Sequence, residues 1–147
     1  AEYVAEHFPE ARLWPEDTVA RARARSIASE MHAGFAHLRR ELPMNCRARR
    51  TRRARSAGVD QDVARVLDCW RSTLRNFGGD GPFLFGDFTI ADAFFAPVAC
   101  RFFTYDVEVD DTGADYLDTL FSIPAMQQWM CDAESEPMVI AEYDAVE

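Results

Sequence analysis

Residues 90–104 restrict the fold more than any other segment, because apolar side chains would surround the whole circumference of the helix they predict. Such a helix cannot face water on any side, so it must lie at the centre of a domain. Pro97 lies within the segment and predicts a kink or a tolerated break. The apolar side chains are those of Ala93, Phe94, Phe95, Ala96, Val98, Ala99, Phe102 and Phe103.

The residues that open this helix, Thr89-Ile90-Ala91-Asp92, have the form of a capping box. In a capping box the threonine hydroxyl accepts from the third helical amide, and the carboxylate three residues later accepts from the cap amide. Phe88 is placed to pack on the first turn as a hydrophobic staple. We therefore assign Thr89 and Asp92 a structural role and no catalysis.

Four further segments have apolar residues at steps of three and four and predict amphipathic helices around the central one. The first is a long helix over residues 16–42, and the second spans 60–77. Two short helices are predicted over 112–121 and 124–134, followed by an acidic tail that drapes over the surface. No segment predicts a credible sheet. The fold class is therefore all-α, a helical bundle of about five main helices.

Length and composition indicate one globular domain. A chain of 147 residues can bury a real core, and 48% hydrophobic with 28% charged residues excludes the disordered class. No apolar run approaches the roughly 20 residues that a membrane-spanning helix needs, so we expect no contact with a membrane.

The net charge of −9 is unevenly divided along the chain. Up to Arg75 there are 15 arginines and 10 acidic residues, whereas from Asn76 onward there is one arginine and 15 acidic residues. This division is compatible with a nucleic-acid-binding arm or with two oppositely charged faces. Arginines gather at 47–55, in a connection over 43–58 without an apolar period. Because no aromatic residue is interleaved there for base stacking, we expect a solvated loop and no nucleic-acid partner.

The four cysteines, Cys46, Cys69, Cys100 and Cys131, are widely spaced and have no histidine-rich segment beside them. We expect no metal site, and we interpret them as small core or surface residues of a reduced, cytoplasmic protein. The opening residues contain no signal peptide and look like the last turns of a helix that Pro9 ends. They indicate that the chain is a piece of a longer protein.

Three strings of the sequence resemble, in order, the glutathione S-transferase family. Phe-Gly-Asp-Phe-Thr-Ile-Ala-Asp-Ala at 85–93 is similar to the start of the buried sixth helix of these enzymes. Ile-Ala-Ser-Glu-Met-His-Ala-Gly-Phe at 27–35 resembles the fourth helix of the bacterial beta class. The first ten residues and Leu-Trp-Pro at 13–15 resemble the end of the N-terminal domain and the interdomain linker. The resemblance implies that residues 1–15 belong to that end and linker, and that 16–147 form the all-helical C-terminal domain.

This resemblance also implies a function for the whole enzyme. A thioredoxin-like N-terminal domain of the same protein would hold most of the glutathione site and the catalytic residue, so that no residue of this chain is catalytic. The enzyme would be a cytoplasmic homodimer that adds the thiolate of its co-substrate glutathione to small apolar electrophiles without a metal. The alternative is a freestanding helical module of the same fold, which binds a protein or RNA through its arginine-rich connection.

His32 is the residue that the resemblance assigns to the glutathione site, since beta-class enzymes place a histidine of the long helix in their active-site cleft. It stands one residue beyond the apolar stripe and thus at the edge of that helix face. Arg25 and Arg39, seven residues on either side of it, would add a positive potential suited to the two carboxylates of glutathione. The alternative is a half-exposed histidine without a role.

The resemblance further implies an apolar acceptor pocket between the long helix and the central helix. Its candidate residues are Met31, Phe35, Phe102, Phe103 and Tyr105. Helical spacing equally favours Met31 and Phe35 as core residues. Tyr105, with a hydroxyl at a helix end, is suited to the rim of a pocket.

Overall fold

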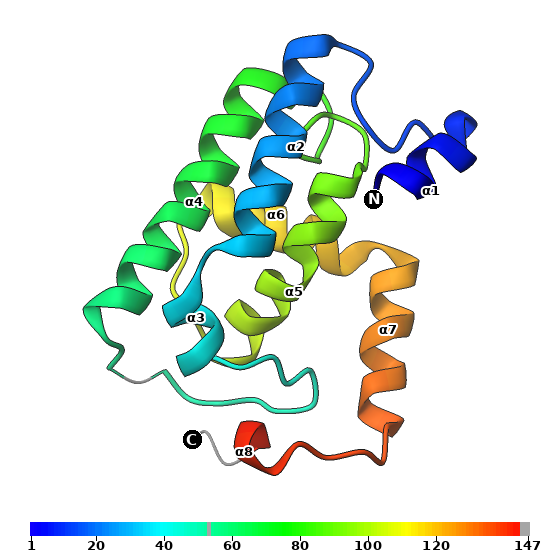
Figure 1. Ribbon diagram of the computed structural model, residues 1–147. Helices are drawn as coiled ribbons and strands as arrows, with labels where there is room; N and C mark the ends of the chain where they lie inside the picture. Colours follow the sequence, from blue (N-terminus) through cyan, green and yellow to red (C-terminus); the bar gives the residue numbers. More distant parts are fainter. Residues whose placement is uncertain (53, 145–147) are drawn as a thin grey trace.

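The structure, a computed structural model, describes residues 1–52 and 54–144 and is all-helical over these residues (Figure 1). No strand is present in the described part of the chain, where only two isolated bridges occur within residues 83–87. The all-α class is thus confirmed. The helices, with the 3-10 helix η1, are α1 (Glu2–His7), η1 (Pro9–Ala11), α2 (Thr18–Ala33), α3 (Ala36–Glu41), α4 (Ala57–Phe77), α5 (Ile90–Thr104), α6 (Asp111–Ser122), α7 (Pro124–Ser135) and α8 (Ala141–Asp144).

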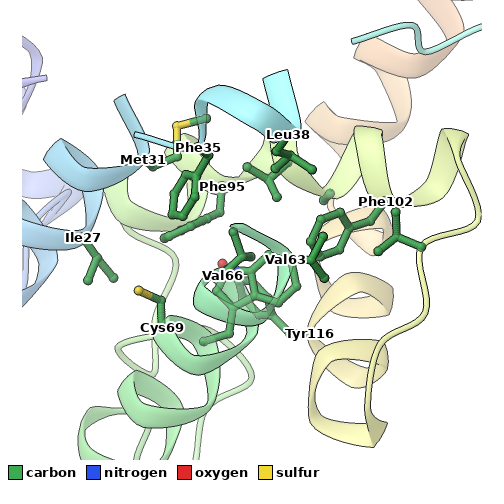
Figure 2. Close-up of a cluster of buried hydrophobic side chains, with 14 of the residues drawn as sticks. Ile27, Met31, Phe35, Leu38, Val63, Val66, Cys69, Phe95, Phe102 and Tyr116 are labelled. Atoms are coloured by element: carbon green, nitrogen blue, oxygen red, sulfur yellow. The ribbon is translucent and has the colours of Figure 1, made fainter. Parts of the chain in front are cut away.

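The core forms around α5, as the apolar character of its sequence predicts. Figure 2 shows side chains of α2, α4, α5 and α6 pointing toward one another in one buried cluster. Trp70 of α4 is fully buried at its centre and makes ring contacts with Phe95, Phe102 and Tyr116, with centroid distances of 5.8, 5.5 and 4.9 Å. The aromatic side chains therefore connect three helices.

The predicted long helix over residues 16–42 is wrong, because the structure divides it into α2 and α3. Gly34 is extended, and Phe35 takes a left-handed conformation with φ of 58°. A Cβ on Gly34 would lie 2.7 Å from the Glu30 carbonyl oxygen, so only glycine fits this exit from α2. Leu38 and Phe35 nevertheless face the same core as Met31. The apolar period therefore continues across the break and conceals it.

The other predicted helices are present with small changes at their ends. The second begins at Ala57 instead of residue 60, because the Ser56 hydroxyl accepts from the Val59 amide at 3.3 Å. The short helices α6 and α7 lie within two residues of their predicted bounds. Helix α5 runs without interruption through Pro97, so the proline is tolerated within the helix and does not end it.

The arginine-rich connection is less solvated than predicted, since most of its side chains hold other segments of the chain. Arg47 donates to the Glu136 and Met138 carbonyls, and Arg50 donates to the Asp144 carbonyl at 2.8 Å. Arg52 pairs with Glu108, whereas Arg55 pairs with Asp60. Figure 1 shows the acidic tail running from α7 back to this connection, where α8 lies. The tail therefore lies against the surface, as expected.

Residues 1–15 are attached to the bundle at a few points, while most of their side chains are exposed. The Glu2 carboxylate accepts two hydrogen bonds from Arg25, at 2.9 and 2.7 Å. Trp14 packs on the core, and the Leu13 carbonyl accepts from the Ile90 amide at 2.9 Å. The segment is therefore attached at α2 and at the first turn of α5.

The start of α5 is fixed by the capping box that the sequence predicts. The buried Asp92 carboxylate accepts from the Thr89 amide at 2.8 Å and from the Thr89 hydroxyl at 2.9 Å. It also accepts from the Leu84 amide at 3.1 Å and from the Tyr116 hydroxyl at 2.9 Å. Burial raises the pKa of Asp92 although these four donors act in the opposite direction. One carboxylate thus ties α5 to the preceding turn and to α6.

Replacing Asp92 by alanine is expected to lower the free energy of unfolding by at least about 3 kcal/mol, because it removes the acceptor of four donors, all at buried positions. Asp92→Asn retains the shape but cannot accept from both backbone amides, so it should also destabilise, although less. Equilibrium urea denaturation measures both effects. Asp118→Ala, at an exposed position of α6, is the control and should change stability by no more than about 0.5 kcal/mol. An equally small effect of Asp92→Ala would contradict this account.

Candidate functional site

A depression of about 400 Å³ lies between α2, α3 and α5 and brings together two of the three predicted glutathione contacts. His32 lines it from the last turn of α2, and Arg39 lines it from α3. Arg101 of α5 completes a basic group, and no acidic residue is among the lining residues. These residues are Met31, His32, Arg39, Met44, Ala93, Phe94, Pro97 and Arg101.

Arg39 is held at the C-terminal end of α2. Its guanidinium donates to the Gly34 carbonyl at 3.0 Å, to the His32 carbonyl at 3.3 Å and to the Met31 carbonyl. These carbonyls lie where the helix leaves its last acceptors without intrahelical partners and where its dipole favours a cation. Arg39 therefore has a fixed position, which the break at Gly34 makes possible.

Arg101 is a buried arginine without an ion-pair partner in the described part of the chain. Arg101 is only 8% exposed to solvent. Its Nη1 donates to the Pro97 carbonyl at 2.9 Å, whereas its buried Nε has no hydrogen-bond partner among the described residues. Burial lowers the pKa of Arg101, and repulsion by Arg39 lowers it further. A buried cation of this kind is costly unless an anion compensates it. The pair of guanidiniums therefore favours an anionic ligand.

Sequence reasoning missed Arg101, although a signal was present. It is the one arginine that follows Asn76, and it lies in the helix that is apolar almost all round. A cation at such a position must be buried, and a buried cation needs a partner. A charged residue within an apolar helical segment is therefore the sequence signal that identifies Arg101.

His32 is exposed at the rim of the depression, which agrees with its predicted position at the edge of the helix face. Its backbone carbonyl accepts from Arg39 at 3.3 Å, and the residue lines the depression together with Arg39 and Arg101. The depression is therefore lined by one histidine and two arginines. The three groups can together hold a carboxylate or lie beside a thiolate.

Arg25 is not part of this group. It lies two helical turns before His32, about 10 Å along α2. There it forms an ion pair with Glu2 at 2.7 Å, and its guanidinium lies 5.7 Å from the centre of the Trp14 ring. Arg25, which the sequence analysis assigned to the glutathione site, is therefore bound by Glu2 and Trp14 near the start of the chain.

The five residues predicted for an acceptor pocket do not line one cavity. Met31 reaches the depression, but Phe35 and Phe102 are buried in the core. Phe102 also borders a separate cavity of about 590 Å³ between α5, α6 and α7, where Phe103 is half exposed. Tyr105 is buried, and its hydroxyl donates to the Pro43 carbonyl at 2.9 Å. Phe103 therefore faces a different cavity from Met31.

The described residues contain neither a candidate metal site nor a candidate membrane span. No group of three or more His, Cys, Asp or Glu side chains in that part of the chain is arranged to hold a metal ion. No described helix combines the length and apolar character needed to cross a bilayer.

Comparison with known proteins gives a likeness in structure and none in sequence. No family model and no curated protein matches the chain. Among solved structures, the chain is similar to a glutathione transferase homolog from Burkholderia, strain BGR1, determined with bound glutathione. The TM-score is 0.62 at 19% identity, and the match covers 92% of this chain and 66% of that one. At this identity the likeness shows a shared, glutathione transferase-like fold.

Replacing Arg101 by methionine should increase the free energy of unfolding by about 1 kcal/mol or more, since it removes a buried charge that repels Arg39. The same substitution should reduce the stabilisation that sulfate gives relative to chloride at equal ionic strength. Thermal and urea unfolding measure both quantities. Arg75→Gln removes one exposed arginine outside the depression and serves as the control. A loss of stability in Arg101→Met, with an unchanged sulfate effect, would show that no anion belongs at this site.

Proposed function

We propose that this chain is the helical C-terminal domain of a cytoplasmic glutathione transferase. In this proposal a thioredoxin-like N-terminal domain of the same protein activates glutathione, and the whole enzyme adds the glutathione thiolate to small apolar electrophiles. The catalytic residue then lies outside this chain. The fold shared with a glutathione-bound homolog supports the proposal, although the chain spans only 66% of that protein's length.

The observation that carries the proposal is the basic depression formed by His32, Arg39 and Arg101. Glutathione carries two carboxylates and a thiol, and a fixed pair of guanidiniums is suited to one of its anionic groups. His32, at the rim, would lie near the sulfur and provide a polar contact. Met31, Met44 and Phe94 add apolar surface to the same depression, against which an electrophile can pack.

The proposed assembly is a homodimer, in which α2 supplies much of the interface. Val19, on the outer face of α2, is 67% exposed and available for such a contact. The thioredoxin-like domain would adjoin the start of the chain, where Glu2 of α1 pairs with Arg25 of α2.

The alternative function, a module that binds protein or RNA through the arginine-rich connection, is not favoured. Arg47, Arg50, Arg52 and Arg55 donate to carbonyls or carboxylates of this chain. Arg49 stacks on the Phe103 ring, 4.1 Å from its centroid. These guanidiniums would have to leave their partners before they could bind phosphates.

The purified chain of 147 residues should not conjugate glutathione to 1-chloro-2,4-dinitrobenzene above the uncatalysed rate, because the residue that activates the thiol would lie in the other domain. Absorbance of the conjugate measures the rate. The same assay on the protein encoded together with any upstream thioredoxin-like segment should show turnover. Turnover by this chain alone would contradict the proposed division between the domains.

In that longer enzyme, His32→Ala should reduce the conjugation rate or the affinity for glutathione several-fold and leave the helical circular dichroism spectrum unchanged. The matched control is His37→Ala, since His37 is an exposed histidine of α3 that does not line the depression. Initial rates at varied glutathione concentration distinguish the two variants. If His32→Ala and His37→Ala had the same kinetic parameters, His32 would be an exposed residue without a role in the reaction.

A further inference from the structure

Two cysteines from distant parts of the sequence pack together beneath the C-terminal tail. Cys46 belongs to the connection after α3, and Cys100 belongs to the third turn of α5. They form one small buried cluster with Met126 of α7. Cys46 is 8% exposed to solvent and Cys100 is 0% exposed. Both are free thiols. The fold thus places side by side two thiols that the sequence separates by 54 positions.

The surroundings of this pair stabilise a thiolate on Cys46. The Cys100 side chain and the nearby charges of Arg49 and Arg101 lower the pKa of Cys46 to about 7, against the effect of burial. The interaction with Cys46 raises the pKa of Cys100. The Cys100 thiol also lies 3.7 Å from the Met130 sulfur, to which it donates. Three further charged residues line the cavity beside Cys46: Arg47 and Asp144 form an ion pair with each other at 3.6 Å, and Glu136 is exposed. One thiol therefore has the properties of a nucleophile and its neighbour remains protonated.

Cys46 is also reachable from a cavity. It lines a space of about 370 Å³ between the connection, α7 and the tail, whose other walls include Trp129, Met138 and Tyr143. The tail that covers this space is attached mainly through Arg47, Asn45 and Arg50. A small neutral oxidant can therefore enter without unfolding of the helical core.

We propose that Cys46 and Cys100 form a redox-active pair that peroxides convert to an intramolecular disulfide. The Cys46 thiolate attacks one oxygen of the peroxide, so that the O–O bond breaks, an S–O bond forms, and hydroxide or alkoxide leaves. The resulting sulfenic acid is attacked by the Cys100 sulfur. The S–S bond forms as the S–O bond breaks, and the departing hydroxide leaves as water with the Cys100 proton. Two thiols are oxidised by two electrons, and one peroxide is reduced.

The test uses the chain with Cys131→Ser, because Cys131 is exposed and would react independently. Hydrogen peroxide is added near pH 7, the reaction is stopped by N-ethylmaleimide in denaturant, and intact and peptide masses are measured. We expect the loss of two alkylatable thiols, a mass decrease of two hydrogens and a peptide pair linked through residues 46 and 100. The internal control is Cys69, whose pKa burial raises to about 11. Cys46 should react at least ten times faster than Cys69.

Two further variants keep the result interpretable. In Cys100→Ser the reaction should stop at a Cys46 sulfenic acid, which dimedone captures, whereas Cys46→Ser should leave Cys100 unmodified. Circular dichroism verifies that both variants fold. Oxidation of Cys46 and Cys69 at equal rates, or linkage only between separate chains, would overturn the proposal. None of these readouts depends on glutathione or on conjugation, so their failure would leave the proposed transferase function untouched.

Discussion

The buried carboxylate of Asp92 is the interaction on which the rest of the structure depends. It accepts from the Thr89 amide and hydroxyl, from the Leu84 amide and from the Tyr116 hydroxyl, and so joins α5 to the preceding turn and to α6. These bonds set both the position and the rotation of α5. Ala93, Pro97 and Arg101 follow at steps of four on one face of that helix, and all three line the basic depression. The geometry of the candidate site is therefore determined at the N-terminus of α5.

The elements predicted correctly from sequence are those whose signals are local. The capping box at Thr89 and Asp92 and the proline at the start of α7 need only neighbouring residues, so their helices begin where expected. The single helix over 16–42 failed for a tertiary reason. Phe35 and Leu38 pack on the same core as Met31, and the apolar period therefore masks the turn that Gly34 introduces.

The candidate site could be predicted only in part for a similar reason. The position of His32 at the edge of its helix follows from the spacing. Arg39 lines the same depression because its guanidinium reaches the C-terminal end of α2 across the break at Gly34. Arg25 satisfies the same spacing, but its pairing with Glu2 joins segments 23 residues apart and has no local signal. Arg101 was not predicted as a site residue because it lies in an apolar helix, although it is the one arginine in the acidic half of the sequence. Pairs such as Cys46 and Cys100 likewise become apparent only when the chain is folded.

The central claim, that the depression between α2, α3 and α5 receives an anionic group of glutathione, is tested most directly by nuclear magnetic resonance. A ¹⁵N-labelled sample of this chain is titrated with reduced glutathione, and amide shifts are assigned to residues. The account predicts weak, saturable shifts concentrated at the end of α2, at Arg39 and along the Ala93–Arg101 face of α5. Shifts confined to the cavity beside Phe103, or no saturable shift at millimolar glutathione, would contradict it.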